Sequence, residues 1–165
     1  MTGEDEQTAT FERFFLTQQP RLVAIGLGWC GEPEVAREVA QEALARAYRD
    51  WQRVSRLDIP GAWVRRVLIN LLIDRQRSER RNRELVHRLG PPEVVAAPVV
   101  DDLRWWETVR SLPERQRAVI TLHYLDELSI AEVAEILEIA PGTVKSTLSQ
   151  ARDRLRRILT EEVEE

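Results

Sequence analysis

Residues 129–157 read SIAEVAEILEIAPGTVKSTLSQARDRLRR, and this stretch determines the fold predicted for the C-terminal half of the chain. It opens with Ser129 and Glu132 at the spacing of a capping box, in which each side chain satisfies the other residue's backbone N–H group. Apolar side chains then recur with helical period, so a short helix is predicted from Ser129 to Glu138. Its apolar positions are Ile130, Val133, Ala134, Ile136 and Leu137.

A second helix is predicted after a turn of only three residues, 138–140. Pro141 and Gly142 restart the helical pattern, which continues to about residue 162. Two helices joined by so tight a turn form a helix-turn-helix, a motif that places its second helix in the major groove of duplex DNA. The side chains expected to face inward from this second helix are Val144, Leu148, Ala151 and Leu155.

The outward face of the second helix carries residue types that contact DNA. Short hydroxyls, an amide and long cations are the groups that reach base edges and phosphates. On this pattern alone, an ordinary helical hairpin with polar solvent-facing positions is the alternative. The residues expected at the DNA surface are Thr143, Lys145, Ser146, Ser149, Gln150 and Arg152.

Composition and charge describe a globular chain with two basic patches. The 165 residues are 43% apolar and 32% charged, a balance typical of folded proteins, and the formal net charge is −4. Between Arg65 and Arg88, however, eight arginines stand against three acidic residues, and residues 152–157 carry four more arginines. Basic residues gathered in patches favour contacts with phosphate groups, although a merely solvated helix face would have the same composition.

Several classes of protein are excluded by what the sequence lacks. No apolar run approaches the roughly 18 residues that span a bilayer, and the polar N-terminus has no signal-peptide pattern, so a cytoplasmic location without membrane insertion is expected. Cys30 is the single cysteine, and no Cys/His cluster has metal-ligand spacing, so no metal or cofactor is expected. Neither a glycine-rich phosphate loop nor a nucleophile motif is present, so an enzyme with catalytic residues is not expected.

The chain is predicted to be all-α, with two small helical domains joined by a linker. The predicted domains are residues 8–89 and 102–162, because the stretch at 90–101 contains three prolines and no helical period. An irregular polar segment is expected at 52–58. The helices are expected at about residues 10–30 (with a break near Gln19 and Pro20), 33–51, 60–89, 103–111, 113–125, 129–138 and 141–162.

Five segments together resemble the extracytoplasmic-function (ECF) sigma factors of bacterial RNA polymerase. The segments SLPERQRAVI (111–120), LDELSIAEVA (125–134) and GTVKS (142–146) are similar to the family's C-terminal promoter-reading domain. EVAQEAL (38–44) looks like its polymerase-docking helix, and PGAW (60–63) with Asn70, Asp74 and Arg77 looks like its melting and recognition helix. The resemblance covers about residues 11–159, nearly the whole chain.

This resemblance implies a transcription initiation factor that directs core RNA polymerase to specific promoters. The N-terminal domain, sigma region 2, would bind core polymerase and hold the melted −10 element, and the C-terminal domain, sigma region 4, would read the −35 element as duplex through its helix-turn-helix. An anti-sigma factor is the usual regulatory partner in this family. The resemblance assigns polymerase binding to Glu38, Gln41 and Glu42, and −10 DNA binding to Arg65, Arg66, Asn70, Asp74, Arg77, Arg80 and Arg81.

The recognition helix departs from the family pattern at three positions. Thr147 and Gln150 stand where the family usually has arginine, and each lost contact would weaken duplex binding by about 1–3 kcal/mol if it was bidentate. Ala140 stands where a serine often caps the helix, at a cost of roughly 1 kcal/mol. We therefore expect either that the domain prefers an unusual −35 sequence, or that it depends more on polymerase to be placed on the promoter.

Two other functions stay open on the sequence. A helix-turn-helix regulator that binds duplex DNA without acting as a sigma subunit would explain the second half, but it would leave the docking helix and the Arg65–Arg88 patch without a role. An antagonist that docks on polymerase without initiating transcription would explain the altered recognition helix. Specific DNA binding by the purified chain alone would favour the regulator, because a sigma factor should need core polymerase.

Overall fold

The computed structural model describes residues 3–86 and 101–161, and within them the fold is all-α, as predicted. No strand occurs in these two described ranges. The predicted linker lies outside them except for Asp101. The elements are α1 (Gly3–Cys30), α2 (Pro33–Arg49), α3 (Trp51–Val54), α4 (Pro60–Val86), α5 (Asp101–Arg110), α6 (Glu114–Ile120), the π-helical turn η1 (Thr121–Leu125), α7 (Ile130–Leu137) and α8 (Pro141–Glu161).

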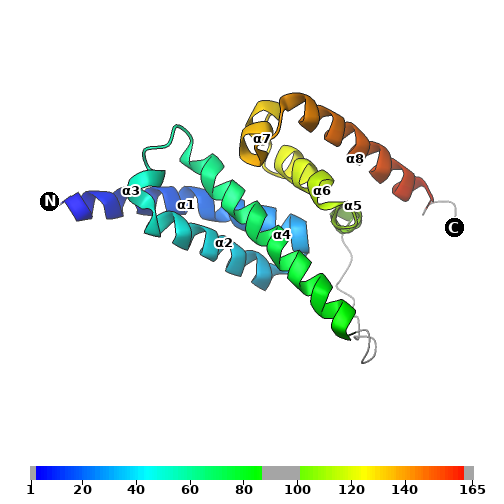
Figure 1. Cartoon of the computed structure of the whole chain (residues 1–165), viewed down its shortest axis with the longest axis horizontal. Coiled ribbons are helices and arrows are strands. Elements are labelled where there is room, and N and C mark those ends of the chain that lie inside the picture. The colour runs from blue at the N-terminus through cyan, green and yellow to red at the C-terminus, as the bar shows by residue number, and fades with distance from the viewer. Residues whose placement is uncertain (1–2, 87–100, 162–165) are drawn as a thin grey trace.

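The helices form two bundles that pack against each other (Figure 1). The first bundle contains α1, α2, α3 and α4, and the second contains α5, α6, η1, α7 and α8. Helix α1 contacts α5 and η1, and α4 contacts α7. A single continuous apolar core therefore runs through both bundles.

Helix α1 continues through Pro20, so the predicted break near that residue is wrong. Proline removes one backbone hydrogen bond and crowds the turn before it. Pro20 is exposed, however, so water can hydrate the carbonyl that loses its partner. The residues that follow, Leu22, Ile25 and Trp29, are buried, and their packing keeps the helix continuous.

A short helix, α3, occupies part of the segment predicted to be irregular. Trp51 and Val54 are buried, and the indole Nε1 of Trp51 donates a hydrogen bond to Thr10 Oγ1 at 3.2 Å. The Trp51 ring also packs edge-on against Phe11, with centroids 5.2 Å apart. These contacts to α1 select a helical turn that the polar local composition does not predict, because they join residues about 40 positions apart.

The two bundles approach closely at Gly28, near the end of α1. A Cβ atom at this position would lie 3.3 Å from Leu125 and 3.4 Å from the Trp106 ring, which is tighter than ordinary van der Waals contact. Any larger residue at this position would push the Leu125 or Trp106 side chain aside by a few tenths of an ångström, so glycine lets α1 lie against the second bundle at this distance. The prediction of two domains on a linker did not include this contact, because it depends on packing between residues far apart in the sequence.

Candidate nucleic-acid interface

The helix-turn-helix has the local geometry predicted for it. Ser129 Oγ accepts from the Glu132 N–H at 3.2 Å, and the Ser129 N–H donates to the Glu132 carboxylate at 2.7 Å, so the capping box is complete. Hydrogen bonds from Ser129 to the carboxylate, chiefly from its backbone N–H, lower the pKa of Glu132. Helix α7 ends at Leu137. Glu138 follows it in a left-handed conformation with φ of 55°, and the Ile139 N–H returns to the Ala134 carbonyl at 3.1 Å.

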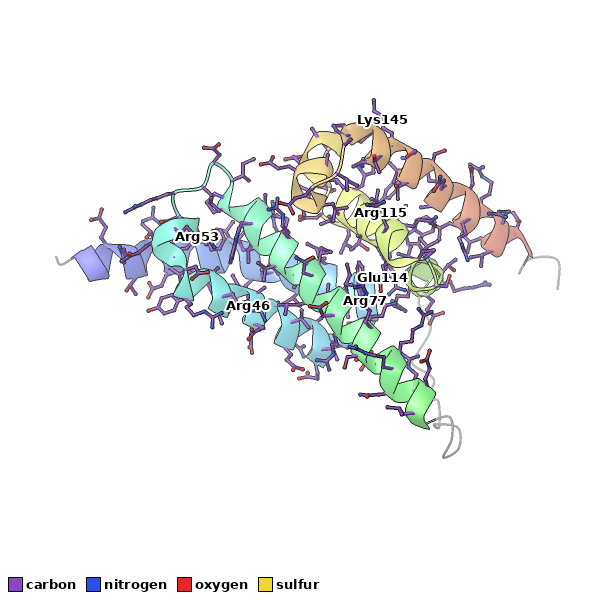
Figure 2. The ribbon with its side chains drawn as sticks, in the orientation of Figure 1. Arg46, Arg53, Arg77, Glu114, Arg115 and Lys145 are labelled. Carbon is purple, nitrogen blue, oxygen red and sulfur yellow. The ribbon has the colours of Figure 1, made fainter. Side chains whose placement is uncertain are left out.

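Helix α8 has the predicted division into an inner and an outer face. Val144, Leu148, Ala151 and Leu155 are all buried, as expected for the inner stripe. Figure 2 shows Lys145 at the end of α8 nearest α7, pointing away from both bundles. Of the six residues expected at the DNA surface, Thr143 is half-buried and the others are exposed: Lys145, Ser146, Ser149, Gln150 and Arg152.

The two positions where the family usually has arginine lie in different surroundings. The side chain of Thr147 is only 6% exposed, so it packs within the second bundle. Gln150 is exposed on the outer face. An arginine in place of Gln150 could therefore reach a ligand directly, whereas a guanidinium at position 147 would first have to leave the core.

Five of the seven residues predicted to bind −10 DNA are exposed on α4. Four of them lie on the half of the helix that extends toward Val86 and share an open hollow of about 510 Å³: Asp74, Arg77, Arg80 and Arg81. Asn70 is exposed one turn earlier, where it lines a separate cavity of about 260 Å³ between α4 and the second bundle. This part of α4 offers three guanidinium groups, one carboxylate and one amide to a ligand.

Arg65 lies in the contact between the bundles. Its guanidinium forms an ion pair with Asp126, which follows η1, and Nη1 donates to Gln18 Oε1 at 3.1 Å. The side chains of Arg65 and Asp126 are 6% and 5% exposed. In this arrangement the Arg65 guanidinium is enclosed by protein and does not reach a phosphate.

Arg66 and Arg77 also bridge the bundles. Arg66 donates to the carbonyls of Glu135 and Ile136 at 2.7 and 2.9 Å, and its guanidinium lies 3.0 Å from the Glu138 carboxylate. A cation placed on the last carbonyls of a helix stabilises that helix end, here the end of α7. Figure 2 shows Arg77 on α4 beside Glu114 on α6, and the two side chains share hydrogen bonds of 2.9 and 3.2 Å.

Arg77 differs from Arg65 in exposure, because 62% of its side chain still contacts solvent. Its hydrogen bonds to Glu114, and the charge of that carboxylate, hold the pKa of the guanidinium above its usual value. The Arg77 pair is therefore a surface pair of the kind that contributes little to stability and exchanges easily with other partners.

The residues predicted to bind polymerase lie on the free face of α2. Glu38, Gln41 and Glu42 are exposed, while the opposite face of the helix packs into the first bundle. Glu38 pairs with Arg75 at 3.2 Å, and Glu42 pairs with Arg46 at 2.8 Å. Figure 2 places Arg46 on the side of the first bundle away from α7 and α8, so this face stays open while the bundles are in contact.

Sequence reasoning missed the residues that join the bundles, although one signal was present. Arg65, Leu68, Ile69 and Leu72 follow the i, i+3, i+4, i+7 spacing of a buried stripe, which places Arg65 on the inner face of α4. Its partner Asp126 gave no such signal, because a single acidic residue after a helix has many possible roles.

The comparisons with known proteins agree with the fold and the motifs. Residues 14–82 match the family described as Sigma-70 region 2, and residues 102–155 match Sigma-70, region 4. The RNA polymerase sigma-E factor of Streptomyces coelicolor is 30% identical over 148 residues, covering 88% of this chain and 84% of that protein. The ECF RNA polymerase sigma factor SigW of Bacillus subtilis is 33% identical, covering 78% of each chain.

Solved structures show the same fold at lower identity. The sigma factor RpoE of Bartonella quintana, in complex with the anti-sigma factor NepR, superposes with a TM-score of 0.76 at 24% identity, covering 92% of this chain and 97% of that one. CnrH, in complex with the cytosolic domain of CnrY, superposes with a TM-score of 0.69 at 20% identity, covering 93% of this chain and 90% of that one.

The chain has two helical units that match sigma regions 2 and 4, and the second contains a helix-turn-helix. It is therefore an RNA polymerase sigma factor. The chain belongs to the extracytoplasmic-function group of these factors. In the two described ranges, no helix is both long enough and apolar enough to cross a membrane.

Proposed function

We propose that this ECF sigma factor holds a promoter at two points while bound to core polymerase, with α8 on the −35 duplex and α4 on the melted −10 strand. The observation that carries the proposal is the row of exposed polar residues on the outer face of α8, from Lys145 to Arg152, beside a complete helix-turn-helix. The first turns of such a helix enter the major groove, where side chains reach base edges.

In the same proposal, the exposed face of α2 docks on core polymerase through Glu38, Gln41 and Glu42. Helix α4 supplies Asn70, Asp74 and the arginines of its exposed half to the single-stranded −10 element, since basic side chains can follow the phosphates of a melted strand. Arg65 and Arg66 are held by the second bundle in the described arrangement. They become available to DNA only when the two bundles move apart.

An anti-sigma factor is the regulatory partner that we propose for this chain. The support is the resemblance of its fold to RpoE, whose solved structure contains the anti-sigma factor NepR. A cytoplasmic location belongs to the same proposal, because the factor acts where polymerase and chromosomal DNA are. In this scheme the chain supplies promoter specificity, and the polymerisation chemistry belongs to the core enzyme.

In vitro transcription with core polymerase and genomic fragments tests the proposed function. Promoter-specific transcripts are expected only when the chain and the core enzyme are both present, and the purified chain alone should bind duplex DNA weakly. Specific DNA binding by the chain alone, without any promoter-specific transcript, would instead support a regulator of the helix-turn-helix class. Binding to core polymerase without transcripts from any promoter would support an antagonist.

A library of promoters with randomised −35 sequences tests the expected sequence preference. Because Gln150 replaces the usual arginine at an exposed position, the recovered −35 sequences are expected to differ from the common consensus of the family. Recovery of that consensus would show that the remaining contacts of α8 are sufficient to specify it.

Introducing an arginine is expected to raise promoter affinity at position 150 and to lower the stability of the fold at position 147. Gln150→Arg should tighten promoter binding by about 1–3 kcal/mol if the new side chain makes a bidentate contact. Thr147→Arg should lower the free energy of unfolding by about 1–3 kcal/mol, because the larger side chain would overfill a buried position. Binding by the holoenzyme and urea unfolding measure the two effects.

Thr160→Arg is the matched control, because it adds the same charge at an exposed position near the far end of α8. Equal gains in promoter affinity from Thr160→Arg and Gln150→Arg would mean that added charge, rather than a contact at position 150, causes the effect.

A further inference from the structure

Tyr124 lies in the π-helical turn η1, directly before the helix-turn-helix. Such turns are rare and often occur at functional sites, because the extra residue changes the direction in which a side chain points. Thr121 and Leu122 of this turn are buried, whereas Tyr124 is 43% exposed. Its ring lies at the surface next to α8, and nothing in the proposed promoter contacts uses it.

The Tyr124 side chain holds the guanidinium of Arg152. Arg152 Nε donates a hydrogen bond to the Tyr124 hydroxyl oxygen at 2.6 Å, and the guanidinium carbon lies 5.5 Å from the centre of the ring. The tyrosine is itself supported, because the His123 ring packs edge-on against it at 5.0 Å. His123 in turn has Nδ1 2.8 Å from the Leu128 carbonyl oxygen.

The charge of Arg152 is left uncompensated by this contact. Arg156, one turn further along α8, pairs with the Asp153 carboxylate at 3.2 Å, whereas Arg152 has no carboxylate within ion-pair distance among the described residues. Its two Nη groups make no hydrogen bond to the described part of the chain. A neutral phenol therefore orders the side chain and leaves its full positive charge and four N–H donors for another group.

The position of Arg152 favours a phosphate group as that partner. Lys145, Ser149 and Arg152 follow one face of α8 at spacings of four and three residues. Arg152 lies about 10 Å along the helix axis from Lys145, since each residue of a helix advances about 1.5 Å. Base edges are read mainly by the first turns of a recognition helix, so a cation this far along the helix lies closer to the DNA backbone.

We propose that Tyr124 is a positioning residue, which holds the Arg152 guanidinium in place for a phosphate of the −35 duplex. The inference rests on the proposed function of α8. The hydrogen bond to the phenol restricts a long, flexible side chain before DNA arrives, so less conformational entropy is lost on binding. Tyr124 is thus a determinant of affinity that lies outside the two helices of the motif.

The test measures promoter affinity of the holoenzyme over a range of salt concentrations for Tyr124→Phe, Arg152→Ala and the double variant. Arg152→Ala is expected to weaken binding to every −35 sequence and to reduce the slope of log affinity against log salt by about 1. Tyr124→Phe keeps the ring and loses the hydroxyl, so promoter affinity should fall about three- to tenfold. In the Arg152→Ala background, Tyr124→Phe should have no further effect.

Thermal unfolding of Tyr124→Phe separates positioning from a structural role, because the unfolding midpoint should match that of the wild type. Independent effects of the two substitutions on affinity, or an unchanged salt slope for Arg152→Ala, would overturn the inference.

The variant Lys145→Ala distinguishes failure of this inference from failure of the proposed function of α8. If Lys145→Ala lowers the salt slope and Arg152→Ala does not, α8 binds the duplex and only the role of Tyr124 and Arg152 is wrong. If neither changes it, both proposals fail.

Discussion

Asp126→Ala is expected to lower the free energy of unfolding by about 3–5 kcal/mol, because it leaves the Arg65 guanidinium buried without a counter-charge. The remaining neighbour, Gln18, offers Arg65 one neutral acceptor at 3.1 Å. A neutral amide oxygen compensates a buried cation far less than a carboxylate does. The loss should therefore far exceed that of an exposed ion pair, which is about 0–1 kcal/mol.

The chain has one way to reduce this cost, which is to let the two bundles move apart. Arg65 would then regain water, at the expense of the other contacts between the bundles, which include the bridges through Arg66 and Arg77. We therefore expect Asp126→Ala either to unfold at lower urea concentration or to have a larger radius of gyration by small-angle scattering. Both measurements are needed, because opening of the bundles can hide the loss of stability.

Two further variants separate the ion pair from its surroundings. Arg65→Met combined with Asp126→Leu removes both charges and retains much of the buried volume, so stability and compactness should return close to those of the wild type. Glu135→Ala is the control for removing an exposed carboxylate on nearby α7, and its effect should lie within about 0.5 kcal/mol of zero. A stable and equally compact Asp126→Ala variant would show that the pair is not needed for contact between the bundles.

The elements that could be predicted from the sequence are those determined by local interactions. The capping box at Ser129 and the inner stripe from Val144 to Leu155 depend on residues three to eleven positions apart, and both are present in the structure as predicted. The exposed face of α2 followed from helical period in the same way. The promoter-contact and polymerase-contact roles of individual side chains stay predictions.

The features that could not be predicted depend on contacts over long distances in the sequence or on an altered helical period. The resemblance assigns Arg65 to −10 DNA, and that role stays a prediction; its burial against the second bundle is what the sequence analysis did not include. The break expected at Pro20 did not occur, because packing of the neighbouring apolar residues outweighs one lost hydrogen bond. Tyr124 was missed because the extra residue of the π-helical turn η1 changes which side chains reach the surface.

Arg117 on α6 is the other buried cation that joins the two bundles, and it is bound in a different way. Its side chain pairs with no carboxylate in the part of the chain that the structure describes: it donates to Gln76 Oε1 at 2.8 Å, to the Leu112 carbonyl at 3.1 Å and to the Arg110 carbonyl. Its guanidinium carbon also lies 5.0 Å from the centre of the Trp29 ring. Burial lowers the pKa of this arginine, but guanidinium groups stay protonated at all ordinary pH values.

Arg117→Met is expected to lower the free energy of unfolding by about 2–4 kcal/mol. No buried charge is left behind, so the cost comes from the two carbonyls at the end of α5 that lose their donor. Each should cost about 1–2 kcal/mol, the lower part of the range for an unsatisfied buried group. Gln76 retains one partner, because the Trp29 indole donates to it at 3.2 Å. The loss should therefore be smaller than for Asp126→Ala, although more hydrogen bonds are removed.

Urea unfolding of Arg117→Met measures this loss. Arg115→Met is the control, since Arg115 is an exposed arginine on the same helix. Arg117→Lys should lie between the wild type and Arg117→Met, because an ammonium keeps the charge but cannot reach all three acceptors in the fixed geometry of a guanidinium. Equal midpoints for Arg117→Met and Arg115→Met would mean that the carbonyls at the end of α5 find other donors. A transition that becomes broader or splits in two would instead show that Arg117 couples the unfolding of the two bundles, because cooperativity is lost when independent units unfold separately.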